Sequence, residues 1–205
     1  MQKEDLFESE DFRRCADFHG HICPGLSIGY RAAKVGMDSL KEKRALDEEI
    51  VAIVENNACG TDAVQVLTGC TFGKGNFIFK DHGKQAFTFM GRNTGQGVRV
   101  ALKPDALKPD DRHHELMDKI REGSATKDEQ EEFQTIHLQR AKEILGKTAG
   151  DLFTIQWVNT GLPPKAKIEP SIPCDRCGEP TMASRLVPKN TQKLCKDCAS
   201  EGRRS

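Results

Sequence analysis

Apolar residues recur at every third or fourth position in four segments of the chain, which is the spacing of the buried face of an α-helix. This spacing predicts helices over residues 9–18, 24–41, 111–121 and 126–145. Pro24 lies where the second helix begins, a position that tolerates proline because the missing N–H would be unpaired there anyway. The same helix contains Gly25, Gly29 and Gly36, which are poor helix formers. We therefore expect a neighbouring backbone to approach this helix closely, and we expect this face to contribute to a homodimer built by the core.

Short apolar and β-branched segments predict the strands. We expect strands over residues 49–55, 76–80, 86–90, 98–102 and 152–158. After the first strand, Thr61 or Asp62 is expected to cap a short helix. The second and third strands flank a glycine-containing turn at residues 81–84, which predicts a β-hairpin. The pattern as a whole predicts an α+β fold, with a core of helices on an antiparallel sheet.

Composition changes after the last predicted strand. Residues 159–173 contain four prolines, which resist both helix and interior strand and indicate an extended linker. We therefore divide the chain into a core domain of residues 1–158, the linker, and a small C-terminal domain of residues 174–205. From residue 163 onward nine Lys and Arg oppose five Asp and Glu, so a mildly positive tail balances a negative core.

Charge and hydropathy narrow the classes of protein. The 31 basic and 31 acidic residues give no net charge, so no chain-wide field favours nucleic acid or anionic lipid. No run reaches the ~18 apolar residues that a membrane helix needs. The acidic first ten residues do not resemble a secretory signal. With eight cysteines, the chain is expected in the cytoplasm, where thiols bind metals rather than form disulfides.

The clearest motif lies in the C-terminal domain. Cys174 and Cys177 form one C-x2-C pair and Cys195 and Cys198 a second, with 17 residues between the pairs. Two such pairs at this spacing can place four thiolates around one tetrahedral zinc ion. A segment this short, with few large apolar side chains, needs a metal in order to fold. We therefore predict a structural zinc in a finger of the zinc-ribbon or treble-clef kind.

A second group of histidines and cysteines lies at two turns of the predicted core. His19, His21 and Cys23 alternate in one turn, and Cys59 lies in the other. Imidazole and thiolate together suit a soft or borderline ion, so we predict a second metal site that holds zinc, iron or nickel. Both turns lead into helices, whose N-termini stabilise negative charge. Cys23 and Cys59 are therefore expected to be unusually acidic and are the candidate catalytic groups.

The other histidines and cysteines fit plainer roles. Cys70 and Asp62 are expected close to the second metal site, either as ligands or behind the ligands. His137 lies on an apolar helix stripe and is expected to belong to the core. His113 and His114 lie at the charged start of a helix and are expected to be exposed.

Two long motifs resemble a known family. FHGHICPGLSIGYRAA (residues 18–33) and ENNACGTDAVQVLTGCTFGKGNFIFKDHGKQAFTF (residues 55–89) closely resemble the FmdE family, named after the E subunit of formylmethanofuran dehydrogenase. The resemblance covers roughly residues 10–158, and members often add a C-terminal zinc finger. It implies an α+β core, an intertwined homodimer and a metal-binding cleft lined by the histidine and cysteine turns. It implies little about activity, because the family is named after its operon and its association with a molybdenum enzyme.

Three functions remain open at this point. The resemblance favours a metal-binding accessory protein or subunit of a molybdenum or tungsten formylmethanofuran dehydrogenase-like oxidoreductase, with the finger docking a protein partner. The second is a freestanding enzyme in which metal-activated water, or the thiolate of Cys23 or Cys59, reacts with substrate. The third is a binding module for protein or nucleic acid. Nucleic acid is the weaker partner, because the basic tail has no aromatic residue to stack on a base.

Overall fold

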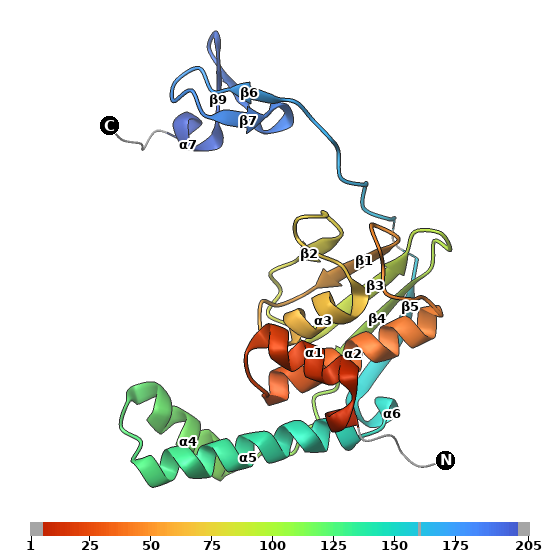
Figure 1. Cartoon of the computed structure of the whole chain (residues 1–205), viewed down its shortest axis with the longest axis vertical. Helices are drawn as coiled ribbons and strands as arrows, with labels where there is room; N and C mark the ends of the chain where they lie inside the picture. Colours follow the sequence, from red (N-terminus) through yellow and green to blue (C-terminus); the bar gives the residue numbers. More distant parts are fainter. Residues whose placement is uncertain (1–5, 160, 201–205) are drawn as a thin grey trace. The chain divides into compact units, whose positions relative to one another are not determined.

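The fold comes from a computed structural model that describes residues 6–159 and 161–200. The chain forms two compact units, Met1–Lys165 and Ala166–Ser205, and each is described by itself (Figure 1). Residues 1–5 of the predicted core domain, residue 160 of the predicted linker and residues 201–205 of the predicted finger domain lie outside the described residues.

The helices of the first unit follow the apolar spacing of the sequence. They are α1 (Glu10–His19), α2 (Pro24–Leu40), α3 (Gly60–Thr68), α4 (Asp111–Glu122), α5 (Lys127–Gly146) and α6 (Ala149–Leu152), with a 3-10 turn at Leu6–Glu8. α2 begins after Cys23, whose Sγ accepts the Leu26 N–H at 3.3 Å. α5 begins with a capping box formed by Thr126 and Glu129.

The start of α3 differs from the prediction. Neither Thr61 nor Asp62 caps this helix, because it begins at Gly60 with Cys59 at the N-cap position. The Thr61 hydroxyl instead donates to the carbonyl of Ala58 at 2.9 Å. Asp62 lies in the first turn, which leaves its carboxylate available to the neighbouring α1.

The sheet of the first unit is mixed rather than wholly antiparallel. Its strands, in the spatial order β2-β1-β3-β4-β5, are β1 (Ile50–Val54), β2 (Phe77–Phe79), β3 (Ala86–Gly91), β4 (Gly97–Leu102) and β5 (Phe153–Val158). Three of the four pairings are antiparallel, and β2 pairs with β1 in parallel. The antiparallel prediction is therefore wrong at the β2 edge.

The predicted hairpin between β2 and β3 is wrong for the same reason, because β1 lies between these strands. The connection crosses the end of β1 instead of turning back on itself. The carbonyl oxygen of Glu55, just after β1, accepts the N–H groups of His82 at 3.3 Å and Lys84 at 3.0 Å. The alternating pattern of the two segments is the same in either pairing, so it does not distinguish them.

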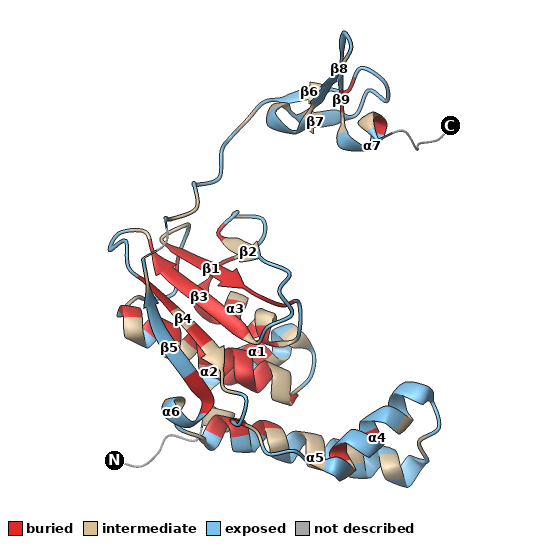
Figure 2. Cartoon of the chain, turned by 180° about the vertical axis from the view of Figure 1, so that it is seen from behind, coloured by how far each residue is buried: buried red, intermediate tan, exposed pale blue. Residues whose placement is uncertain are grey.

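Helices α1, α2 and α3 lie on one face of the sheet (Figure 1). The view from behind shows that the central strands β1 and β3 are buried and that most of β5 is exposed (Figure 2). Phe89 of β3 fills the space beside Gly36 of α2, where an added Cβ would lie 2.1 Å from the phenyl ring. On the other face, Leu162 packs on Val51 and Met90, so the chain that follows β5 covers part of the sheet.

Helices α4 and α5 form a hairpin that extends away from the sheet (Figure 1). His113 of α4 is 5 % exposed, so the prediction that it is exposed is wrong. Its Nε2 lies 2.8 Å from Nδ1 of His137 on α5, and Phe133 stacks on both rings. The start of α4 is charged in sequence, but His113 is buried there because α5 packs against it. His114 is exposed.

The second unit is small and held by few apolar contacts. Its elements are β6 (Ser171–Pro173), β7 (Pro180–Met182), a 3-10 turn at Ala183–Arg185, β8 (Val187–Lys189), β9 (Gln192–Leu194) and α7 (Lys196–Ala199). β6 pairs with β7 and β8 with β9, both antiparallel. Its buried apolar cluster consists of Cys174, Leu194 and Cys198, so two of the three buried residues are cysteines.

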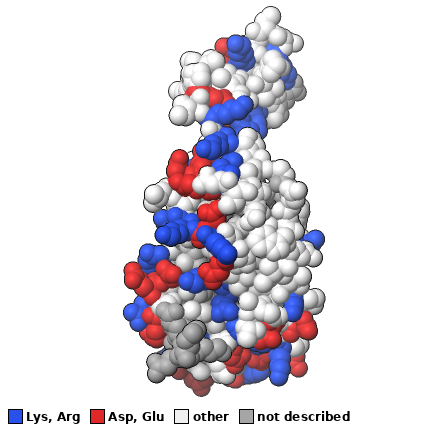
Figure 3. Space-filling view, turned by 90° about the vertical axis from the view of Figure 1, so that its right-hand side faces the viewer, with Lys and Arg blue, Asp and Glu red and all other residues white. Residues whose placement is uncertain are grey.

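Two further features concern the hydropathy of the helices and the charge of the surface. In the part of the chain that the structure describes, no helix combines the length and the hydropathy needed to cross a membrane. On the face shown in Figure 3, basic and acidic side chains are interspersed and a broad area is uncharged.

Candidate metal centre

A short loop between α1 and α2 supplies three of the predicted ligands. α1 ends at His19 because Gly20 takes the left-handed conformation, with a φ of 90°. α2 begins only a few residues later, with Cys23 at its N-cap and Pro24 in its first turn. His19, His21 and Cys23 are therefore held within one tight connection between two helices.

The close approach of α2 and α3 brings the fourth predicted ligand, Cys59, to the same place. A Cβ on Gly29 would lie 2.1 Å from the carbonyl oxygen of Gly60, and a Cβ on Gly25 would lie 3.2 Å from Cβ of Cys59. The predicted close backbone approach is therefore confirmed, and its partner is α3 of the same chain. Within the chain, α3 therefore covers Gly25 and Gly29 of this face.

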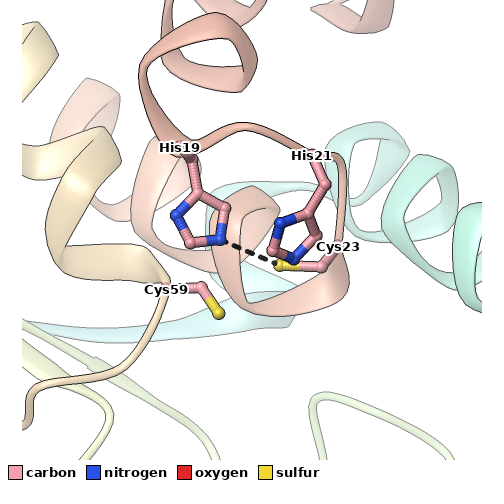
Figure 4. A group of neighbouring side chains, drawn as sticks. All are labelled: His19, His21, Cys23 and Cys59. Carbon is pink, nitrogen blue, oxygen red and sulfur yellow. Dashed lines mark hydrogen bonds between the residues drawn. The ribbon is translucent and has the colours of Figure 1, made fainter.

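The four side chains converge on one point. His19, His21, Cys23 and Cys59 each offer one ligand atom, and these atoms all lie within 4.8 Å of one another. Figure 4 shows the two imidazole rings beside the two sulfur atoms. A tetrahedral ion with bonds of ~2.0–2.3 Å holds its ligand atoms roughly 3.3–3.8 Å apart. A small inward movement would therefore fit this set of two nitrogens and two sulfurs to zinc, iron or nickel.

A carboxylate orients one of these imidazoles. Nδ1 of His19 lies 2.7 Å from Oδ2 of Asp62, while Nε2 of His19 lies 3.9 Å from Sγ of Cys23. A proton on Nδ1 that is donated to Asp62 leaves the Nε2 lone pair facing the group, as in the carboxylate–histidine–metal arrangement. Asp62 is thus behind His19 rather than among the four converging side chains.

The end of β1 holds the turn that carries Cys59. Oδ1 of Asn56 accepts the N–H of Ala58 at 3.0 Å, which shapes this turn. Arg99 donates two hydrogen bonds to Glu55, at 2.7 and 3.0 Å, and this ion pair holds the pKa of Glu55 below its usual value. Sequence analysis did not identify Glu55 and Arg99 as an ion pair at the end of β1. The available signal was an acidic residue at the end of an otherwise apolar strand.

The pKa of the Cys23 thiol is not lowered, although its position at a helix start predicted that it would be. Burial raises its pKa to about 11, and the N–H of Leu26 opposes this only in part. The expectation of an acidic Cys23 is therefore wrong, because removal from water outweighs the helix N-terminus. A divalent cation at this point would reverse the balance, since a coordinating thiol loses its proton.

Cys70 lies outside the converging group. It is fully buried, and its thiol donates to the carbonyl of Ile50 at 3.3 Å. Burial raises the pKa of this thiol. The structure therefore places Cys70 against β1, as a small buried side chain of the core.

The second unit brings its own four cysteines together. The sulfur atoms of Cys174, Cys177, Cys195 and Cys198 all lie within 4.8 Å of one another. The N–H groups of Cys177 and Cys195 lower the pKa of Cys174 to about 6, whereas the neighbouring thiols, Cys195 first, raise the pKa of Cys198 to about 12. A tetrahedral zinc ion bound here would hold all four side chains as thiolates.

A mixed-sheet α+β domain with a histidine and cysteine centre, followed by a four-cysteine finger, defines the class of protein. The sequence model described as "FmdE, Molybdenum formylmethanofuran dehydrogenase operon" matches residues 18–154. The model of the prokaryotic dksA/traR C4-type zinc finger matches residues 167–201. The chain therefore belongs to the FmdE family and carries a zinc-finger domain at its C-terminus.

Two relatives extend the comparison. The fold is similar to the crystal structure of a tungsten formylmethanofuran dehydrogenase FmdE-like protein from Syntrophus aciditrophicus, with a TM-score of 0.62 and 25 % identity over 98 % of this chain and 97 % of that one. A probable S-adenosyl-L-methionine-binding protein of Archaeoglobus fulgidus is 33 % identical over 202 residues. That match covers 91 % of this chain and 51 % of the relative, so the chain spans about half the length of the curated relative.

Proposed function

We propose that the chain is a metal-binding accessory protein or subunit of a formylmethanofuran dehydrogenase-like oxidoreductase. In this proposal His19, His21, Cys23 and Cys59 hold a zinc, iron or nickel ion in the core. The four-cysteine finger holds a structural zinc and docks a protein partner. A reducing compartment, the cytoplasm, suits both sets of thiols.

The proposal of a core metal rests on one observation. Four ligand atoms from two turns lie within 4.8 Å of one another, and Asp62 orients His19. Packing alone does not require this arrangement, because alanine or valine would fill the same space without an ionisable thiol.

Metal content tests the proposal directly. Protein purified anaerobically without a metal-chelating column, with zinc, iron and nickel supplied, should contain two metal ions per chain. Replacing His21 and Cys59 together by alanine should remove one ion and leave the finger zinc. Cys70→Ala is the matched control, a buried cysteine outside the group, and should keep both ions. A stoichiometry of one ion per chain in the wild type would refute the core site.

A freestanding metal enzyme is the second candidate. Its support is that His21 is exposed while Cys23 is buried, so the centre is reachable from solvent at one ligand. Displacement of the exposed imidazole would open a position for a metal-activated water. Turnover of an activated ester by the zinc-loaded chain alone, lost in Cys59→Ala but not in Cys70→Ala, would favour this candidate over the accessory role.

Homodimerisation is part of the proposal. The glycine face of α2, expected from the sequence to contribute to the dimer, packs on α3 of the same chain, so we propose the hairpin of α4 and α5 as the contact instead. The hairpin exposes Met117, Ile120 and Leu138 by 37–38 % each, on helices that extend from the core. Light scattering at micromolar concentration should give twice the chain mass. Met117→Lys combined with Ile120→Lys should give a monomer, because buried charges would oppose association. A monomeric wild type would contradict this part.

A further inference from the structure

A groove of about 380 Å³ lies beside the metal centre, outside the residues that form it. It lies between α1 and the second half of α3, with one side chain from the segment that follows α2 and one from the segment that follows α3. Its lining residues are Arg14, Phe18, Arg44, Gln65, Val66 and Thr71. This volume falls within the range of small-molecule sites in proteins, roughly 300–1,000 Å³.

The charges in the groove are of one sign. Arg14 and Arg44 are its ionisable lining residues. Arg14 pairs with Asp11 at 3.0 Å. Nε of Arg44 donates to the carbonyl of Val66 at 2.9 Å, and no carboxylate of the described residues lies within 4.0 Å of the Arg44 guanidinium. A guanidinium without a carboxylate partner is suited to bind an anionic group with two hydrogen bonds.

An aromatic ring stands at the same groove. Phe18 is 60 % exposed, although it directly precedes His19 at the end of α1. A ring in this position offers a face on which a planar group can stack, next to the cationic side chains. Gln65 and Thr71 add an amide and a hydroxyl, which can donate or accept hydrogen bonds.

The groove is linked to the metal centre through hydrogen bonds. Nε2 of Gln65, on the groove wall, donates to Oδ1 of Asp62 at 3.4 Å. The other carboxylate oxygen of Asp62 lies 2.7 Å from Nδ1 of His19. Two hydrogen bonds therefore separate the groove wall from a side chain of the centre, and a ligand in the groove would lie next to it.

We propose that this groove binds a small organic anion with a planar ring, with the ring on Phe18 and the anionic group on Arg44. The anionic group is a phosphate or a carboxylate, which share the same recognition by a guanidinium. None of the lining residues belongs to the four converging side chains, so the proposal does not require a metal in the core.

Binding of adenosine derivatives to the full chain tests the proposal, by calorimetry at low ionic strength. AMP and adenosine-5′-carboxylate carry the two anionic groups on one ring system, whereas adenosine lacks the anion and inorganic phosphate lacks the ring. We expect at least one of the two anionic probes to bind one per chain with a Kd of about 1 mM or below. Adenosine and phosphate should bind at least tenfold more weakly. The tighter anionic probe identifies the anionic group.

Two variants locate the binding. Phe18→Ala changes an exposed side chain and Arg44→Gln removes the charge, and each should weaken binding of the anionic probe at least tenfold. Arg121→Gln, at a 73 % exposed arginine on α4, is the matched control and should leave the Kd unchanged. Circular dichroism checks that Arg44→Gln is folded.

Either of two results overturns the proposal. One is the absence of saturable binding by both anionic probes up to about 10 mM. The other is an unchanged Kd in either Phe18→Ala or Arg44→Gln. Repeating the titration with the variant that lacks His21 and Cys59 separates this site from the core metal. Unchanged binding there is expected whether or not the core holds an ion.

Discussion

Replacing Gly29 by alanine should destabilise the core and loosen the metal centre. The added Cβ would lie 2.1 Å from the carbonyl oxygen of Gly60. An ordinary contact between such atoms is about 3.5 Å, so α2 and α3 must separate by roughly 1.4 Å. The obstructing atom belongs to the backbone and cannot rotate away, unlike the end of a flexible side chain. The separation also moves Cys59 away from Cys23, because each cysteine lies at the start of one of these helices.

The size of the effect follows from two opposing contributions. Overpacking of a core costs roughly 1–3 kcal/mol, and the upper end applies because backbone meets backbone. Alanine in place of glycine favours a helix by about 1 kcal/mol. The net loss is about 2 kcal/mol, which lowers Tm by roughly 4–8 °C for a chain of this length. A displacement of about 1 Å at one ligand should also weaken core metal binding at least tenfold.

Gly146→Ala provides the matched control for this experiment. Gly146 also lies in a helix, at the end of α5, but nothing lies within 4 Å of the Cβ that alanine would add. Its Tm should stay the same or rise by a few degrees, since only the helix preference changes. Thermal unfolding by circular dichroism measures both variants. The packing argument is refuted if Gly29→Ala has the wild-type Tm or a higher one.

Three further predictions concern single interactions. Asp62→Ala should lower core zinc affinity about 10–100-fold in competition with a chromogenic chelator, because His19 loses its orienting acceptor; an unchanged affinity would remove Asp62 from the centre. Cys177→Ser should release the finger zinc and expose residues 166–200 to protease while the core Tm stays constant; full zinc occupancy would contradict the four-cysteine site. Burial lowers the pKa of both His113 and His137, so the native state binds fewer protons than the unfolded state near their unfolded pKa of about 6.5. The free energy of unfolding in urea should therefore be highest above about pH 6.5 and fall as the pH decreases through the native pKa values. His137→Gln should flatten this dependence, and an equal slope in the variant would count against the contribution of the His113–His137 pair.

Helix positions were the part of the fold that local pattern predicted best. α1, α2, α4 and α5 were expected from their apolar spacing, and their ends agree with the structure within one residue. The reason is physical, because a helix closes its hydrogen bonds within one segment and its caps are neighbours in sequence. The four-cysteine finger was recognisable for a similar reason, since its ligands come in two short pairs.

Strand pairing and side-chain environment were decided by contacts between distant segments. β2 and β3 have the alternation of a hairpin, yet β1 lies between them, and alternation carries no information about which neighbour a strand takes. His113 was expected to be exposed from its charged surroundings, but α5 covers it. The acidity of Cys23 was misjudged because sequence shows a helix start and does not show how much water is removed.

The sequence by itself determined the types of ligand, their grouping at two turns, and the glycines that let two helices meet. Those properties are local, since they depend on residue chemistry and on short-range backbone preference. The tertiary structure decided that Gly29 meets Gly60 within one chain, so that Cys59 joins the turn that carries His19 and His21. It also selected Asp62 and left Cys70 against β1, because distance between segments is set by packing of the whole core.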